Sequence, residues 1–182
     1  MGGDVVDEDG FDAFYRGTSQ RLARYAYGLT GNATEAQDLT QEVFARAWQH
    51  WRTVQAYDEP EAWLRVVLTR LATDRWRRSR VHRAASASLR PPDPVQPPSE
   101  TTVLLVTALR RLPMPHRRAL VLHYLLDRSV ADIARELQTN VNTVKSWLAR
   151  GRTNLAAALG DAAALGDATQ PADSTSGEPN AR

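Results

Sequence analysis

The string SVADIARELQTNVNTVKSWLARGRTNL, residues 129–155, predicts two helices that meet at a tight turn. Ser129 and Asp132 have the spacing of a capping box, which predicts the first turn of a short helix. Asn140 is suited to cap a second, longer helix over residues 141–158, because its side-chain oxygen can accept from the free amides of the first turn. This order of cap, short helix, turn, cap and long helix predicts a helix-turn-helix.

Apolar residues at helical spacing predict how these two helices pack. The small side chain of Ala134 would allow the two axes to cross closely. The opposite face of the second helix carries hydrogen-bond donors and small groups, which suits the reading of base edges in a major groove. The apolar faces are Val130, Ile133, Ala134 and Leu137 on the first helix and Val144, Leu148 and Leu155 on the second.

We therefore predict that the second helix reads DNA, with arginines nearby that hold phosphates and so position it. The alternative interpretation is an ordinary helical hairpin whose polar face is simply solvated. The candidate base-reading residues are Asn142, Thr143, Lys145, Ser146, Ala149 and Arg150, and the candidate phosphate contacts are Arg117, Arg118 and Arg152.

Charge is unevenly distributed along the 182 residues. Residues 1–12 hold five acidic residues and no basic one, and residues 160–182 hold four acidic residues and one basic residue. Residues 13–159 hold 12 acidic and 22 basic residues, a net charge of +10. A basic body between acidic ends predicts a polyanionic partner.

Several classes of protein are disfavoured by what the sequence lacks. The chain has no cysteine, which excludes disulfides, thiolate metal ligands and cysteine nucleophiles. Its four histidines are scattered, and no nucleophile–base set or pair of carboxylates in an apolar setting is visible. No apolar run approaches the ~20 residues of a membrane-spanning helix, and the N-terminus is acidic, unlike a signal peptide. We expect a cytoplasmic protein that is not an enzyme, with no cofactor, metal, membrane insertion or small-molecule substrate.

Prolines and glycines divide the chain into helical and irregular parts. The fold class is predicted as all-α: two small helical domains joined by a Pro-rich linker, the second containing the helix-turn-helix. The predicted ranges are a disordered N-terminus over 1–10, a first domain over 11–83, a flexible linker over 84–100, a second domain over 101–159 and a disordered tail over 160–182.

The second domain resembles region 4 of bacterial RNA polymerase sigma factors, the region that reads the minus-35 promoter element. Thr-Val-Lys-Ser followed by an arginine, as at residues 143–150, is typical of that region. Gln138 departs from the family pattern, because many relatives have a glycine in this turn. Other regulators share the helix-turn-helix, so this string alone does not separate them.

The first domain carries a more specific resemblance. AQDLTQEVFARAW, residues 36–48, is similar to sigma region 2.2, whose polar helix face docks on a coiled coil of the largest polymerase subunit. The resemblance implies that Asp38, Gln41 and Glu42 contact core RNA polymerase, where acids can pair with basic residues. On its own, the pattern also fits a generic amphipathic helix with a solvated face.

The next helix, EAWLRVVLTRLATDRWRRSR over residues 61–80, resembles sigma regions 2.3 and 2.4, which open the minus-10 element and hold an unstacked base. Arg70 stands where relatives usually carry Asn, which puts the minus-10 preference in doubt. Arg70, Asp74 and Arg78 also have the spacing of a salt-bridge stripe, and Trp48, Trp51, Trp63 and Trp76 are expected in the core. The implied minus-10 contacts are Arg52, Tyr57, Arg65, Thr69, Arg70, Arg77 and Arg78.

The resemblance covers about residues 11–159 and shows neither a region 1.1 nor a region 3 domain, as in the extracytoplasmic-function (ECF) group, here of actinobacterial type. It implies a sigma factor that binds core RNA polymerase and promoter DNA and directs promoter-specific initiation; an anti-sigma factor is a further partner that it allows. The alternative is a free-standing helix-turn-helix regulator. That alternative accounts for residues 116–158 but assigns no function to the motif at 36–48 or to the arginine-rich helix at 61–80.

Overall fold

In the computed structural model, residues 7–85 and 99–167 are described, and they form helices with no strand. The N-terminal half contains α1 (Glu8–Thr30), α2 (Ala33–Gln49), α3 (Trp51–Val54) and α4 (Pro60–Ala85). The C-terminal half contains α5 (Glu100–Arg111), α6 (Met114–Leu120), a π-helical turn η1 (Val121–Leu125), α7 (Val130–Glu136) and α8 (Val141–Asp167). The all-α class and the helix-turn-helix are confirmed.

The ends of the N-terminal helices follow from local capping. Asp7 accepts a hydrogen bond from the Gly10 amide at the start of α1. Gly31 ends that helix in the left-handed region, with φ of 68°, and its N–H donates to the carbonyl of Tyr27. Asn32 then caps α2 by accepting from the Glu35 amide. A glycine and a cap in succession turn the chain sharply, so α1 and α2 pack as an antiparallel pair.

The helix-turn-helix is built as its caps predict. Ser129 accepts from the Asp132 amide at the start of α7, and Asn140 accepts from the Thr143 amide at the start of α8. Gln138 adopts a φ of 51°, a left-handed conformation in which glycine is less strained. The backbone conformation of this turn would therefore suit a glycine at position 138 as well.

Several predicted boundaries differ from the structure. Helix α8 continues to Asp167, into the range 160–182 predicted as a disordered tail, because residues 156–165 are rich in alanine and leucine and favour helix. Helix α1 begins at Glu8 rather than at residue 11, and α4 extends to Ala85. The central part of the predicted linker, residues 86–98, lies outside the described residues.

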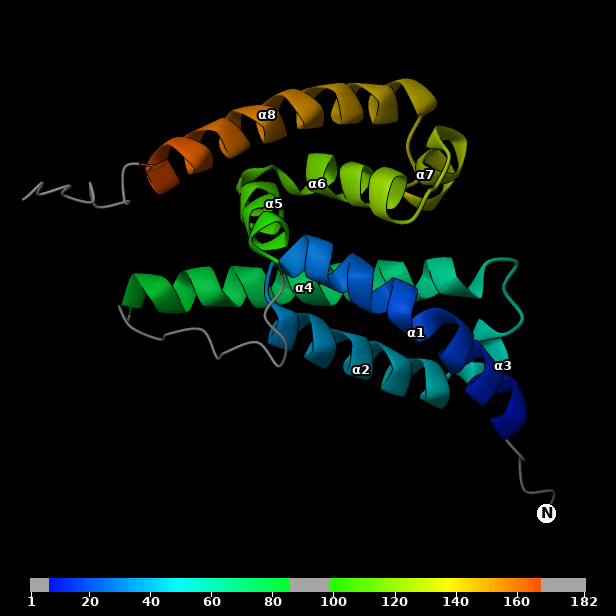
Figure 1. Cartoon of the computed structure of the whole chain (residues 1–182). Helices are drawn as coiled ribbons and strands as arrows, with labels where there is room; N and C mark the ends of the chain where they lie inside the picture. The colour runs from blue at the N-terminus through cyan, green and yellow to red at the C-terminus, as the bar shows by residue number, and fades with distance from the viewer. Residues whose placement is uncertain (1–6, 86–98, 168–182) are drawn as a thin grey trace, which may run out of the picture.

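The two halves pack against each other as layers (Figure 1). Helix α8 is outermost, α5, α6 and α7 lie beneath it, and α1 and α4 follow, with α2 on the opposite side of the molecule. Helix α1 packs against α5, α6 and η1, so buried residues of both halves join in one apolar cluster. The sequence-based picture of two tethered domains contained no such contact between them.

The tryptophans only partly follow the prediction that they lie in the core. Trp51 is buried, at 5% exposure, and packs against the rings of Phe11 and Phe14. Trp48 is 37% exposed and Trp76 is 46% exposed, so the core prediction is wrong for these two. Both lie on helix faces that no neighbouring helix covers fully, a property that spacing on one helix does not reveal.

Candidate nucleic-acid and polymerase interfaces

The helix-turn-helix is held by three apolar side chains at the crossing of α7 and α8. Ile133 and Val144 are fully buried, and Leu148 is nearly so. Gly151 lets α8 approach α6, since a Cβ there would lie 3.1 Å from Cδ1 of Leu120. This close packing fixes the rotation of α8 about its axis and thereby decides which of its residues face outward.

The predicted reading face of α8 is turned to solvent as one surface. Asn142, Lys145, Ala149 and Arg150 are exposed, and Ser146 is half-buried. Thr143 is also half-buried, and its hydroxyl donates to the Asn140 side chain at 3.0 Å, so part of its hydrogen-bonding capacity serves the cap. Since α8 lies outermost, no other described helix covers this face (Figure 1).

The three predicted phosphate arginines have different surroundings. Arg152 is exposed on α8 and lies 3.4 Å from the hydroxyl of Tyr124. Arg118 is half-buried on α6 and faces the other half of the molecule. Arg117 is buried, at 8% exposure. Only Arg152 is presented beside the reading face.

Arg117 is a structural residue, which corrects its prediction as a phosphate contact. Its Nη1 donates to the carbonyl of Leu29 in the N-terminal half at 2.6 Å. Its Nη2 donates to the carbonyls of Arg110 and Leu112 at 2.5 and 3.1 Å. Burial, reinforced by the positive charge of Arg110, lowers the pKa of Arg117 to about 10. The side chain thus stays charged at neutral pH and ties carbonyls of both halves together.

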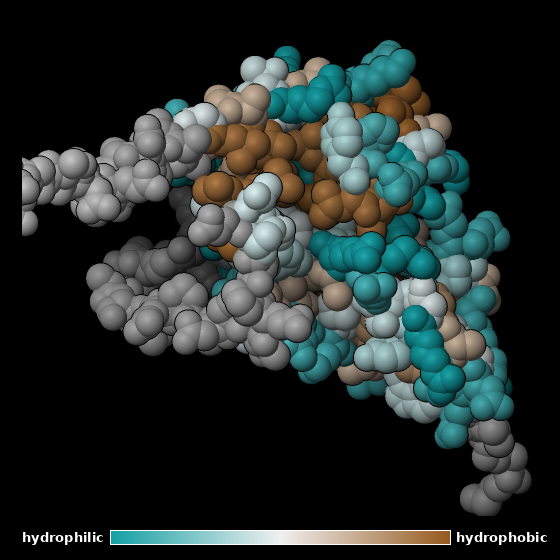
Figure 2. Space-filling model, in the orientation of Figure 1, coloured by the Kyte–Doolittle hydropathy of each residue, from teal (hydrophilic) through white to brown (hydrophobic). Residues whose placement is uncertain are grey.

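An uncovered apolar groove follows α8 on the same half (Figure 2). It measures about 430 Å³ and lies where α5, η1 and α8 meet. Tyr124, 53% exposed, stands at its edge beside Arg152. All of its lining residues belong to the C-terminal half, and its aliphatic residues are Leu105, Leu109, Leu120, Val121, Leu125, Leu155, Ala156 and Leu159.

The predicted polymerase-contacting face of α2 is available. Asp38 and Gln41 are exposed, while Leu39, Val43 and Phe44 on the opposite side are buried. Glu42 differs from its neighbours because it is half-buried and paired. Its carboxylate accepts from Arg46 at 2.7 Å and from Arg75 of α4 at 2.8 Å. Two of the three predicted contacts are therefore free to meet a partner, and the third would have to exchange its ion pairs.

The minus-10 candidates fall into exposed and buried groups. Two of them are buried and have other partners, which corrects their prediction as DNA contacts in this arrangement of the chain. Arg65 is 3% exposed, and Thr69, 6% exposed, lies 3.0 Å from the hydroxyl of Tyr25 and donates to the Arg65 carbonyl. The exposed candidates are Arg52, Tyr57, Arg70, Arg77 and Arg78.

Arg65 makes a bidentate ion pair with Glu136 of α7. Its Nε and Nη2 lie 3.0 and 2.7 Å from the Glu136 carboxylate, and its Nη1 lies 3.0 Å from Glu61. Burial by itself lowers the pKa of Arg65, but the hydrogen bonds and charge of Glu136, with the charge of Glu61, outweigh burial and raise it above the ordinary value. Sequence reasoning missed this pair because its partners are 71 residues apart and no local spacing links them.

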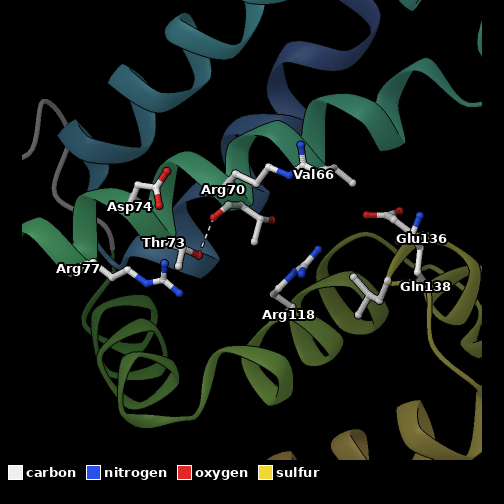
Figure 3. A pocket seen from close by; sticks show the side chains of 10 residues that line it. Val66, Arg70, Thr73, Asp74, Arg77, Arg118, Glu136 and Gln138 are labelled. Atoms are coloured by element: carbon white, nitrogen blue, oxygen red, sulfur yellow. Dashed lines mark hydrogen bonds between the residues drawn. The ribbon is translucent and has the colours of Figure 1, made fainter.

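The salt-bridge stripe considered for α4 is not formed. Between the described side chains of Asp74, Arg70 and Arg78 there is no ion pair, and the Arg78 Nε lies 3.3 Å from the Asp74 backbone carbonyl. Arg70 and Arg77 point instead toward a cavity of about 490 Å³ between α4 and the pair α6–α7 (Figure 3). Arg118 enters the same cavity from α6. The structure therefore gathers three predicted DNA-contacting arginines around the seam between the halves.

Two further findings concern metals and membranes. In the part of the chain that the structure describes, no group of three or more His, Asp or Glu side chains could hold a metal ion. Within the same residues, no helix is both long enough and apolar enough to cross a membrane.

Comparison with known families gives two matches, one in each half of the chain. Residues 14–81 match the model of sigma-70 region 2, and residues 102–155 match that of sigma-70 region 4. The chain belongs to the sigma-70 family. Region 2 corresponds to the half with the polar face of α2, and region 4 to the half with the helix-turn-helix.

Individual relatives narrow the family to the ECF group. The chain is 34% identical over 143 residues to the ECF RNA polymerase sigma factor SigL of Mycobacterium tuberculosis, a match that covers 75% of this chain and 81% of the relative. It is 31% identical over 160 residues to the RNA polymerase sigma-E factor of Streptomyces coelicolor, covering 86% and 88%. This sigma-70 member therefore groups with the ECF sigma factors, which direct promoter-specific transcription initiation.

The fold also matches solved structures. The sigma factor RpoE of Bartonella quintana, solved in complex with the anti-sigma factor NepR, aligns with a TM-score of 0.69 and 21% identity. The alignment covers 83% of this chain and 97% of RpoE. At this identity the likeness concerns the fold alone, and it shows that the arrangement of helices is that of a sigma factor.

Proposed function

We propose that this sigma factor divides its tasks among three surfaces. The α2 face binds core RNA polymerase, α4 with the loop 52–60 engages the minus-10 element, and α8 reads the minus-35 element. The observation that carries the proposal is that α2 and α8 lie on opposite sides of the molecule (Figure 1), and that Asp38 and Gln41 on α2 and Lys145 and Arg150 on α8 are exposed. The two surfaces can therefore meet different partners at the same time. Catalysis stays with the polymerase, and we place the protein in the cytoplasm with it.

Asp38 and Gln41 are the centre of the proposed polymerase contact. Both are exposed on α2, and the buried face behind them fixes their direction. A carboxylate in this position favours a basic partner surface. Its charge chiefly speeds the association of the two proteins and fixes how they align in the complex. Glu42 joins this contact by exchanging its ion pairs with Arg46 and Arg75 for pairs with basic residues of the polymerase.

Replacing Asp38 and Gln41 together with alanine is expected to weaken binding to core polymerase about 10-fold or more, because two central contacts are lost. The fold should be unchanged, since both side chains are exposed. The measurement is the dissociation constant for core polymerase, with circular dichroism to check the fold. Asp161→Ala, which removes an exposed carboxylate at the far end of α8, is the control and should bind normally. Normal core binding by the double variant would remove the α2 face from the proposal.

Lys145→Ala and Arg150→Ala are expected to weaken binding of the holoenzyme to its promoter by about 5- to 100-fold each, the range for loss of one good base contact. Both side chains are exposed on the reading face of α8. Arg16→Ala removes the same charge from an exposed position on α1 and controls for general electrostatics. Unchanged affinity and unchanged sequence preference would show that this face does not enter the groove.

The minus-10 role rests on the exposed arginines of α4 and on the loop before it. Arg70 and Arg77 can bind a DNA backbone, and exposed Tyr57 offers a ring on which an unstacked base can lie. Because Arg70 replaces the usual Asn, we propose that the minus-10 preference differs from that of relatives carrying Asn. Sequencing the transcripts made by reconstituted holoenzyme would reveal that preference.

In vitro run-off transcription tests the function as a whole. Core polymerase with this protein should give promoter-specific transcripts that core polymerase alone does not. Absence of both a transcript and core binding would favour the free-standing helix-turn-helix regulator instead. An anti-sigma factor is a further proposed partner, since the RpoE structure of the same fold was solved with one.

A further inference from the structure

The cavity between α4 and the pair α6–α7, here called the seam cavity, has the size of a ligand pocket. It measures about 490 Å³, within the range of about 300–1,000 Å³ in which small-molecule pockets fall. A strand of several nucleotides would not fit in this volume, and a single phosphate would fill only a small part of it. The size of the seam cavity therefore suits an occupant as large as a short chain of phosphates or a nucleotide.

Three arginines line the seam cavity from two facing walls. Arg70 and Arg77 lie seven residues apart on α4, about two turns, and so share one face of that helix. Arg118 extends from α6 toward α4 (Figure 3). None of the three forms an ion pair or a side-chain hydrogen bond with another described residue. Their guanidinium groups are therefore available to a bound molecule.

Arg118 carries the most specific sign of a ligand. Its Nε is buried, and no acceptor for it lies among the described residues. The Nε atoms of Arg117 and Arg128 share this property, but the terminal nitrogens of those two side chains donate to a carbonyl and to a carboxylate. Arg118 has no acceptor for any of its nitrogens within the same residues. Because buried donors in folded proteins nearly always have a partner, an anion in the cavity would meet a need that the protein's own groups do not.

The acidic side chains at the seam cavity do not balance the arginines. Glu136 is held by Arg65, whose Nε and Nη2 lie 3.0 and 2.7 Å from its carboxylate, so its charge is already compensated. Asp74 is exposed and forms no ion pair with a described residue. Three cations thus face one solvated carboxylate. Like charges that line one cavity repel each other, and a bound anion would relieve that repulsion.

The arginines favour phosphate groups over other anions. A planar guanidinium can bind two phosphate oxygens through parallel hydrogen bonds, which a single point charge cannot do. Arginines on both walls suit a ligand with several phosphates in a row. Val66 and Leu137 add apolar surface to the cavity, and Gln138 adds an amide that can both donate and accept. A nucleoside attached to the phosphates would find contacts there.

We propose that the seam cavity binds a small oligophosphate, held by Arg118 of region 4 and by Arg70 and Arg77 of region 2. The oligophosphate is either inorganic or the phosphate chain of a nucleotide, since both present the same oxygens to the arginines. Arg70 and Arg77 are also proposed minus-10 contacts, so the bound ligand would compete with DNA for them. Only this competition rests on the proposed function; the binding site itself does not.

Titration calorimetry on the full chain tests the site directly. The probes are inorganic triphosphate, ATP and GTP without magnesium, at about 0.15 M salt, where charges farther apart than about 8 Å are largely screened. We expect one saturable site per chain. Equal affinity for the three probes would show that the phosphates alone are recognised, and tighter binding of a nucleotide would show that the nucleoside adds contacts. Absence of saturable binding of all three probes up to about 1 mM would overturn the proposal.

Charge-removing variants locate the site. Arg118→Gln and Arg77→Gln should each weaken triphosphate binding about 10-fold or more, because each loses hydrogen bonds between charged groups. Arg111→Gln on α5 and Arg78→Gln on α4 remove the same charge from exposed side chains that do not line the cavity, and should change affinity less than about 2-fold. Equal losses in all four variants would mean unspecific attraction and would overturn the site. Circular dichroism checks the fold, and exposed Arg77 provides a test that does not depend on the half-buried Arg118.

Competition with DNA tests the consequence. Triphosphate should displace a mixed-sequence, 12-nucleotide single-stranded DNA from the parent protein, and Arg118→Gln should require about 10-fold more triphosphate for the same displacement. Displacement that is equal in the parent and in Arg118→Gln would come from salt screening and would refute competition through the seam cavity. DNA that stays bound while calorimetry shows a filled site would count against Arg70 and Arg77 as minus-10 contacts. Failure of run-off transcription would likewise count against the proposed function and leave the calorimetry unaffected.

Discussion

Replacing Arg117 with alanine is expected to lower the free energy of unfolding by about 3–5 kcal/mol, since hydrogen bonds to a charged group contribute about 1.5–3 kcal/mol each and are not additive. The guanidinium donates to the carbonyls of Leu29, Arg110 and Leu112. The carbonyl of Leu112 lies just before Pro113, where α5 ends and α6 begins. Alanine would leave these carbonyls without the donor that Arg117 supplies and would open a cavity the size of an arginine side chain.

Urea denaturation followed by circular dichroism measures this loss. Arg118→Ala removes the neighbouring arginine, which faces the seam cavity and has no ion pair with a described residue, and should change stability by less than about 1 kcal/mol. Arg117→Lys should recover only part of the loss, because one ammonium cannot reproduce the fork that joins carbonyls in different directions. A loss below about 1 kcal/mol in Arg117→Ala would mean that water replaces the guanidinium, and would restore Arg117 as a candidate for phosphate binding.

Ile133→Ala is expected to destabilise region 4 by about 2–5 kcal/mol, the range for truncation of a fully buried aliphatic side chain. Ile133 is completely buried where α7 meets α8, beside Val144 and Leu148. The cavity would loosen the packing that sets the rotation of α8. Promoter binding should therefore fall together with stability, although Ile133 itself cannot touch DNA.

The control for this change is Val103→Ala on α5, which truncates an apolar side chain that is 44% exposed. It should alter stability by no more than about 0.5 kcal/mol, as is usual for surface positions. Thermal unfolding and promoter affinity of the holoenzyme are the two measurements. If Ile133→Ala lost stability and kept full promoter affinity, the crossing of α7 and α8 would not be what orients the reading helix.

The candidate sites were predictable to different degrees. The exposed positions of Asp38, Gln41, Lys145 and Arg150 follow from helical spacing alone, because the apolar residues on the same helices decide which face turns inward. Trp48 shows the limit of that reasoning, since a large apolar residue beside the buried face remained 37% exposed. How far a neighbouring helix extends over such a position depends on tertiary packing.

The arginines show the same limit more sharply. By composition all of them are equivalent DNA candidates, yet Arg65 is enclosed by Glu136 and Arg117 by backbone carbonyls, while Arg70 and Arg150 remain exposed. The difference lies in partners that are 71 and 88 residues away along the chain. No pattern within one helix distinguishes an arginine that binds DNA from one that holds two domains together.

The sequence by itself determined the helices, their caps and the two sigma regions. Those features depend on contacts within a few residues, such as Ser129 with Asp132 or Asn140 with Thr143. Only the tertiary structure decided that the regions pack together, that Arg65 and Arg117 hold them, and that the arginines of α4 face a seam. Those properties depend on which distant surfaces meet, and such meetings are set by shape and charge complementarity across the whole molecule.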